Sequence, residues 1–252
     1  MTPLDRLPVW WEAGLLFAAM IAAFELTGRL PGRSAPGDGK EGYLVSAAVG
    51  LLALLLGFTF NLGLSHYDLR QTLVVEEANA IAEVGRRLDL LPPPARDAAR
   101  PILVGYAHNR VALAQAGEDG RAIARVETAS IAEQQALWAT VRQATAGPVA
   151  ETWLVAPLDT MFGLAVSRRA ALAARIPVQV TSVLGLYTVI TAAILGYAIP
   201  SGRRRHRAMT TALFALLALT VGLILDLDRP RNGLIQISQQ PLEAVFAQLQ
   251  AR

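Results

Sequence analysis

Four long apolar blocks dominate the sequence and are separated by polar segments. The blocks cover residues 9–26, 43–64, 178–199 and 208–225, and the second and third contain no charged residue. A helix of about 22 residues is about 33 Å long, which is enough to cross a hydrocarbon core of about 30 Å. The pattern therefore predicts an all-α protein with four transmembrane helices arranged as two pairs.

The first block, residues 9–26, has an alternative interpretation as a secretory signal peptide. Only one arginine precedes it, next to an aspartate, and no convincing small-residue cleavage site comes before Glu25. Trp10 and Trp11 at its start are typical of the membrane interface. We therefore expect a membrane helix, with Glu12 and Glu25 near its ends, where carboxylates reach the headgroups.

Residues 65–175 lie between the two pairs and have the periodicity of helices in a polar segment. This insert holds 12 arginines and 12 acidic residues, so its net charge is zero. Breaks are predicted at the prolines of residues 92–94, at the glycines of residues 117–120 and at residues 147–148. Residues 233–238 are the only strand candidate.

The pattern predicts four segments along the chain. Residues 1–64 form the first transmembrane pair, and residues 65–175 form a helical extramembrane insert. Residues 176–227 form the second pair, and residues 228–252 form a tail. In the tail, Pro241 fits the first turn of a short amphipathic helix.

Composition agrees with a membrane protein. Hydrophobic residues make up 53% and charged residues 17%, whereas soluble domains have about 25% charged residues. The chain has no cysteine, which excludes disulfides and thiolate metal sites. A net charge of +3 does not indicate nucleic acid as a partner. Abundant arginine and alanine fit a GC-rich bacterial genome, so we expect a multi-pass protein of a bacterial inner membrane.

Orientation is predicted from the short loops. Residues 200–207 contain four arginines and no acidic residue. The positive-inside rule places such loops in the cytoplasm, which would put the insert and both termini in the periplasm.

Candidate pathway residues lie in the second block and just beyond it. Small residues recur at helical spacing in the last three blocks, which is typical of helix packing or of one face of a water-filled path in an oligomer. Phe58, Phe60 and Asn61 lie near the insert end of the second block, although Phe58 and Phe60 point about 200° apart on a helix.

Charged and amide side chains follow on the same predicted helix. Glu77 falls on its apolar side, whereas Glu76 falls on its polar side, and Asn79 lies nearby. A buried carboxylate needs an arginine or an oligomer partner. Glu77 is thus either a structural ion pair or part of a vestibule below a pore, with Glu76 and Asn79.

The end of the fourth block carries a second candidate cluster, Asp226, Asp228 and Arg229. Two nearby carboxylates can share a divalent metal, but acids at a helix C-terminus also require a compensating partner. We expect a salt-bridge cluster at the membrane interface rather than a metal site. The three histidines are isolated, so we expect no catalytic, cofactor or metal site and no enzyme.

Three stretches resemble the bestrophin-like family of bacterial membrane proteins: GFTFNLGLSHYDLRQTLVVEEANAI, RLDLLP and LILDLDRPRNGLIQISQQP. By resemblance, the positions that match the family motifs are Glu76, Glu77, Asn79, Asp89, Asp226, Asp228, Arg229 and Pro230. Where the family tends to carry Asn, Glu, Asp and His, residues 158–177 depart from it with Asp159, Thr160, Gly163 and Ala165.

The resemblance implies a function and an orientation. True bestrophins are pentameric, calcium-linked anion channels with a similar layout, although this chain lacks the run of acids that forms their calcium clasp. The resemblance implies a homo-oligomeric ion channel or transport protein that contacts lipid and inorganic ions. It also implies a cytoplasmic insert, opposite to the charge-based expectation. The alternative is a non-conducting interaction or signalling module that acts through its insert.

Overall fold

The computed structural model describes residues 8–29, 40–117, 119–144, 151–198, 204–231 and 233–251. Every regular element within these ranges is a helix, which confirms the all-α prediction. Residues 233–238 are irregular, so the strand prediction for them was wrong.

The chain forms two compact units. The span unit consists of Met1–His66, Arg175–Arg229 and Gly233–Ile235. The insert unit consists of Tyr67–Ala174, Pro230–Asn232 and Gln236–Arg252. By these contacts, Gln236–Arg252 belongs to the insert unit.

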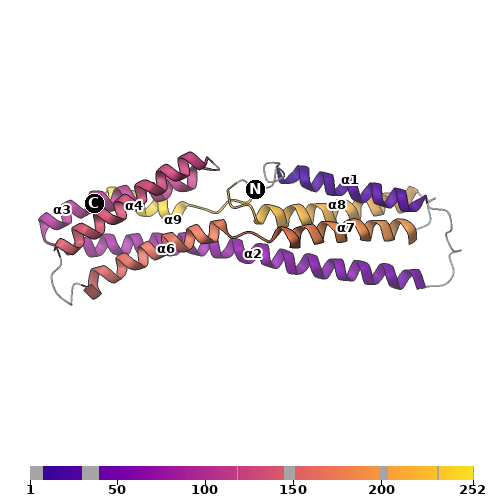
Figure 1. Ribbon diagram of the computed structural model, residues 1–252, viewed down its shortest axis with the longest axis horizontal. Coiled ribbons are helices and arrows are strands. Elements are labelled where there is room, and N and C mark those ends of the chain that lie inside the picture. The colour runs from indigo at the N-terminus through magenta and orange to yellow at the C-terminus, as the bar shows by residue number, and fades with distance from the viewer. Residues whose placement is uncertain are drawn as a thin grey trace. The chain divides into compact units, whose positions relative to one another are not determined.

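The span unit contains α1 (Val9–Gly28), the first part of α2 (Lys40–Leu88), α7 (Val178–Ala198) and α8 (Arg204–Leu227). Helix α1 lies alongside α7 and α8 (Figure 1). Four helical stretches are long and apolar enough to cross a membrane, namely Val9–Gly28, Gly42–Leu88, Trp153–Ala198 and Arg207–Leu227. Each contains most or all of one predicted block, and the chain is a membrane protein.

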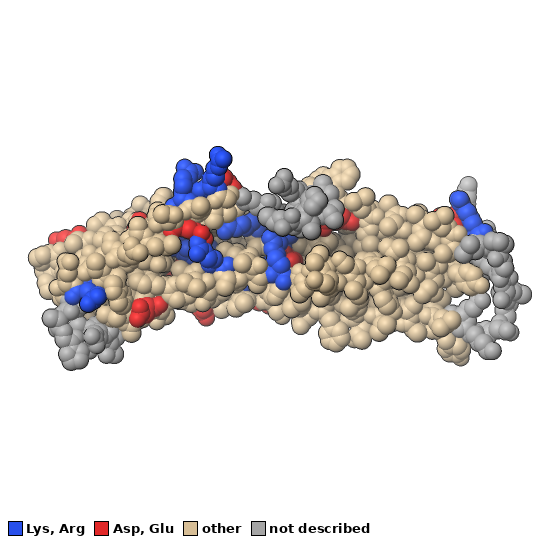
Figure 2. All heavy atoms as spheres, viewed as in Figure 1, with Lys and Arg blue, Asp and Glu red and all other residues tan. Residues whose placement is uncertain are grey.

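Small residues let the helices of the span unit approach closely. A Cβ atom on Gly196 of α7 would lie 2.3 Å from the carbonyl oxygen of Phe24 in α1. Beside it, the Thr27 hydroxyl donates a hydrogen bond to the carbonyl of Ala193 at 2.8 Å. In lipid, such close packing drives helix association in place of the hydrophobic effect. The face of this unit drawn in Figure 2 is almost uncharged apart from its ends.

The insert unit contains the second part of α2, α3 (Pro93–Gln115), α4 (Gly120–Ala144), the π-helical η2 (Glu151–Val155), α6 (Ala156–Ala173) and α9 (Gln240–Gln250). Helix α3 packs against α4 and α9 (Figure 1). It begins at Pro93, within the predicted break at residues 92–94, because proline is well tolerated in a first helical turn. Gly117 has a φ of 55°, a left-handed conformation that suits glycine at the end of α3.

One hydrophobic core holds the insert unit together. Helices α2, α3, α4, α6 and α9 each contribute buried side chains, such as Ile81, Leu103, Leu137, Leu158 and Leu242. The short amphipathic helix predicted in the tail therefore covers part of this core: Leu242 and Leu249 are buried, and Val245 and Phe246 pack against it.

Candidate functional site

One side of α2 is exposed in both units. In the span unit the exposed positions include the small or polar residues Ser46, Gly50, Ala53, Gly57 and Asn61 as well as large apolar residues such as Leu51, Leu54 and Phe58. In the insert unit they include Asp68, Thr72, Val75, Glu76 and Asn79. Most of these positions recur at spacings of three or four residues, as expected for one side of a helix.

The small residues of α2 differ from those of α7 and α8 in their surroundings. A Cβ atom on Gly50 or Gly57 would meet no neighbouring atom within 4 Å. On Gly222 of α8 it would lie 3.1 Å from the Cβ atom of Ala13 in α1. Gly196 of α7 is closed by α1 in the same way. Gly196 of α7 and Gly222 of α8 thus serve packing within the chain, whereas Gly50 and Gly57 of α2 face outward.

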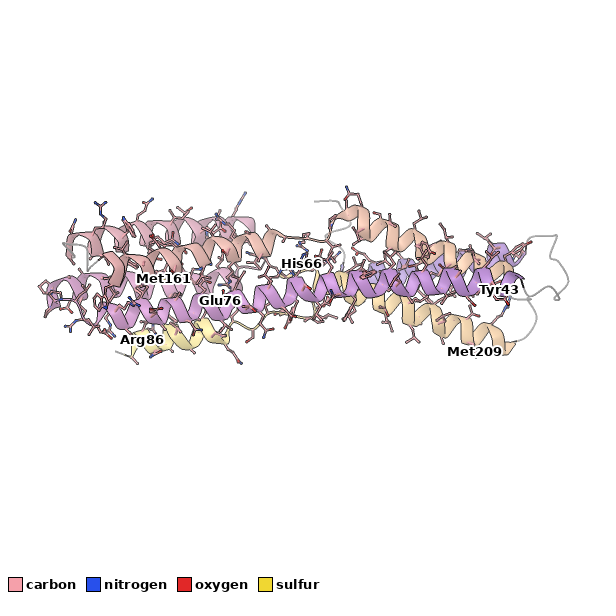
Figure 3. The ribbon with its side chains drawn as sticks, turned by 90° about the horizontal axis from the view of Figure 1, so that it is seen from below. Tyr43, His66, Glu76, Arg86, Met161 and Met209 are labelled. Atoms are coloured by element: carbon pink, nitrogen blue, oxygen red, sulfur yellow. The ribbon has the colours of Figure 1, made fainter. Side chains whose placement is uncertain are left out.

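The predicted pathway residues divide into two groups. Phe58, which is 67% exposed, and Asn61, Glu76 and Asn79 lie on the exposed side of α2. Phe60 is partly buried and packs against the core that contains Leu52, Leu56, Ile176, Leu184, Val221 and Ile224. Phe58 and Phe60 therefore do not form one aromatic constriction within a single chain. Figure 3 shows Glu76 on α2.

Glu77 lies inside the insert unit with no exposed surface. Its Oε1 atom accepts a hydrogen bond from Nε of Arg110 at 2.5 Å, and its Oε2 atom accepts one from Nη1 of Arg168 at 2.6 Å. Both arginines are also buried. The first interpretation of Glu77, a structural ion pair, therefore describes its environment in the chain.

The arginine partners of Glu77 were not identified from sequence. They lie 33 and 91 residues away, in α3 and α6. The sequence contained a sign that Arg110 is buried, because it falls on the side of α3 that buries Tyr106, Ala107 and Val111.

Tyr106 lies in the same core, and its burial raises the pKa of its hydroxyl to about 12. The positive charge of Arg110 opposes this shift, and the negative charge of Glu77 adds to it.

Asp226 holds the segment that follows α8. Its two carboxylate oxygens accept hydrogen bonds from the backbone N–H groups of Leu234 and Ile235 at 2.8 and 2.9 Å. The turn passes so close that a Cβ atom on Gly233 would lie 2.8 Å from the carbonyl oxygen of Asp226. This explains why glycine stands in the NGL sequence after the DLDRP motif.

Asp228 ties the end of α8 to the segment before α7. Its Oδ1 atom accepts a hydrogen bond from the backbone N–H of Ile176 at 2.9 Å and lies 3.7 Å from Nδ1 of His66. The Arg175 guanidinium donates to the Asp228 carbonyl at 2.8 Å.

Arg229 completes the cluster by pairing with α1. Its Nη2 atom lies 2.5 Å from Oε1 of Glu12, and Glu25 at the other end of α1 pairs with Arg207 at 3.2 Å. Both acids of the first apolar block thus have arginine partners. Among the described residues, no group of three His, Cys, Asp or Glu side chains lies close enough together to hold a metal ion.

Comparison with known proteins identifies relatives of the chain. A family model described as the bestrophin-like domain matches residues 7–242. A solved structure described as a membrane protein shares 15% identity and a TM-score of 0.68, over 97% of this chain and 96% of that one. A variant of a bacterial bestrophin homologue from Klebsiella pneumoniae shares 13% identity and a TM-score of 0.67, over 100% and 96%. A second variant shares 16% identity and a TM-score of 0.66, over 96% of both chains.

No match was found among curated protein sequences. At identities of 13–16%, the solved structures show a shared fold. The family model covers nearly the whole chain, including all three stretches that carry the resemblance. The chain belongs to the bestrophin-like family.

Proposed function

We propose that the chain is the subunit of a homo-oligomeric ion channel or transport protein of a bacterial inner membrane, with the exposed side of α2 facing the ion path. The observation that carries this proposal is the outward-facing row of small and polar residues on α2. The family supports it, because the bestrophins that the chain resembles are channels built from several copies.

The chemistry of the α2 surface favours a path over lipid. Leucines on α8 such as Leu216 and Leu219 are 62% and 67% exposed, as suits a surface in contact with acyl chains. The exposed side of α2 also carries leucines such as Leu51 and Leu54, and beside them a row of glycines with Ser46 and Asn61. Polar groups within membrane helices are costly in lipid and typically face a bundle interior or water.

A ring of copies is needed to enclose such a path. One α2 helix offers a single surface and cannot surround an ion by itself. Closed rings are the usual result when identical subunits assemble head to tail. Close approach of α2 helices is compatible with the open space around Gly50 and Gly57.

Ion currents through the purified protein in planar bilayers test the proposal. We expect currents under a KCl gradient, and we expect Asn61→Asp to shift the reversal potential towards cations because acidic rings favour cation passage. An interaction of about 1 kcal/mol between unit charges at 4 Å in water corresponds to about a fivefold change in relative permeability.

A matched control adds the same charge elsewhere. Gln135 is exposed on α4 in the insert unit, and Gln135→Glu is expected to leave the reversal potential unchanged. Assembled protein that passes no current in any salt or pH would contradict the proposal and favour the alternative, a non-conducting interaction module.

A further inference from the structure

Two exposed side chains of opposite charge lie on the same side of α2 in the insert unit. Asp68 and Arg86 are 18 residues apart, and 18 residues of an α-helix make about five full turns. The two side chains therefore lie on one line along the helix, about 27 Å apart at a rise of about 1.5 Å per residue. Between them, the same side exposes the neutral side chains of Thr72, Val75 and Asn79.

Neither charge is compensated within the part of the chain that the structure describes. No described residue forms an ion pair or a side-chain hydrogen bond with Asp68 or Arg86. Glu83, by contrast, lies on the same side of α2 but pairs with Arg87 at 2.5 Å. Unpaired charges at an exposed surface attract mobile ions of the opposite sign, whereas the charges of a close pair largely cancel at a distance.

The charges follow one another in a fixed order along α2. Asp68 is the first charged residue after the second apolar block, and Arg86 lies near the other end of the helix. Glu76 lies between them, exposed and without a described partner (Figure 3). Asp89, the first residue after α2, is paired with Arg100 at 3.1 Å. The exposed side of α2 in the insert unit thus begins acidic and ends basic.

Assembly of copies turns this order into two charged zones. In a closed ring, each copy contributes the same residue at the same depth of the path, so a single charge becomes a ring of like charges. Rings of carboxylates concentrate cations, and rings of arginines concentrate anions. The path therefore contains a cation-rich zone at Asp68 and Glu76 and an anion-rich zone at Arg86.

We propose that this order of charges makes the path rectify, so that it carries more current in one direction than in the other. The inference rests on the proposed function, because it requires a path lined by the exposed side of α2. Asp68 and Arg86 are then the residues that set the direction of the larger current.

The direction follows from the movement of the concentrated ions. When the compartment opposite the insert is positive, cations leave the acidic zone towards the arginines, and anions leave the basic zone towards the carboxylates. Both kinds of ion then accumulate between Asp68 and Arg86, and the conductance rises. The reverse voltage draws both kinds of ion away from this stretch and depletes it. We therefore expect the larger current when the compartment opposite the insert is positive.

Salt concentration changes the range over which the two zones act. The Debye length is about 10 Å at 0.1 M and about 3 Å at 1 M salt. At 0.1 M each ring therefore acts on ions across much of the distance between the zones, whereas at 1 M its effect is confined to its immediate surroundings. Rectification is expected at 0.1 M KCl, and a nearly linear current–voltage relation is expected at 1 M.

Current–voltage curves of the full chain in planar bilayers with equal KCl on both sides test the proposal. At 0.1 M we expect the currents at opposite voltages of equal size to differ at least about twofold. The chain has no cysteine, so thiol labelling of Gln135→Cys from one bath reports which bath the insert faces. The absence of any current would overturn the inference together with the proposed function, whereas a linear curve at 0.1 M would overturn the inference alone.

Charge-swapped variants connect the effect to the two residues. Exchange of the charges, with Asp68→Arg and Arg86→Asp in one chain, keeps the net charge and should reverse the direction of the larger current. Arg86→Glu alone should bring the ratio of the two currents close to one. Arg142 is exposed on α4, and Arg142→Glu makes the same change in charge away from α2 and should leave the ratio unchanged. Rectification that keeps its direction in the exchanged variant would overturn the proposal.

Discussion

Adjacent residues in this chain have opposite environments. Glu76 is exposed on α2, whereas Glu77 is enclosed by the core of the insert unit and paired with two buried arginines. Both are motif positions by resemblance to the family. Their different environments follow from the 100° turn per residue of an α-helix, which carries neighbouring side chains to different sides.

We therefore expect neutralisation of Glu77 to lower the stability of the fold far more than neutralisation of Glu76. Glu77→Gln leaves two buried arginines without their carboxylate and should lower the free energy of unfolding by about 3–5 kcal/mol. Glu76→Gln should change it by less than about 0.5 kcal/mol. Denaturation in detergent followed by circular dichroism measures both, and Glu77→Asp, which keeps the charge, should lose less. Equal stability of the Glu76 and Glu77 variants would rule out the buried ion pair.

Glu133 on α4 predicts a dependence of stability on pH. Burial raises the pKa of its carboxyl, and a hydrogen bond from the Asn109 amide at 2.7 Å opposes this shift. A folded-state pKa above the unfolded value means that the contribution to stability is full below the unfolded pKa. It is lost as pH rises through the folded pKa.

Glu133→Gln imitates the protonated carboxyl and retains an acceptor for Asn109. We therefore expect the variant to unfold at a higher temperature than wild type at pH 7, with the difference shrinking towards pH 4. Glu76→Gln is the control, because its exposed side chain should show no such trend. A Glu133→Gln variant that is less stable at pH 7 than wild type would disprove the assignment.

At the scale of elements, small residues have two distinct surroundings. Gly196 of α7 and Gly222 of α8 are covered by α1, whereas Gly50 and Gly57 of α2 are open. Sequence spacing alone identified all three rows but could not distinguish them, because the distinction depends on which helices are neighbours. A row of small residues that is buried within the chain serves helix packing, whereas a row that is exposed forms an outward-facing surface.

Two glycines of α7 test this difference. Gly196→Ala places a Cβ atom against the α1 backbone and should destabilise the protein by about 1–3 kcal/mol. Gly185→Ala meets no atom within 4 Å and should be neutral or stabilising, because alanine favours helix. Thermal unfolding in the same detergent compares them. Tolerance of Gly196→Ala would contradict the close packing of α1 on α7.

Helices were largely predictable from sequence, and their partners were not. Apolar length predicted the spans, and the prolines at residues 92–94 and the glycines at residues 117–120 predicted ends of insert helices. The predicted break at residues 147–148 lies outside the described residues. In contrast, Asp226 binds the N–H groups of residues 234 and 235, which made a strand-like segment irregular. The partners of Glu77 required contacts between helices far apart in sequence. The local sequence pattern indicates where helices run and where they break. It does not indicate which side chains pair, because pairing depends on tertiary packing.

For the whole molecule, the composition is the average of two environments. The span unit presents exposed leucines to lipid, and the insert segment 65–175 has balanced charge around a core of its own. Helix α2 contributes to both units as one continuous helix. Its exposed side is the surface on which the proposed assembly of copies depends.

The mass of the assembled protein tests the central claim most directly. Native mass spectrometry of the full chain, released from detergent or nanodiscs, counts the copies of the 26.9 kDa subunit. By its resemblance to bestrophins, we expect a ring of five copies, with the exposed sides of α2 facing the axis. A monomer or a dimer under conditions that preserve the fold would contradict a path enclosed by α2.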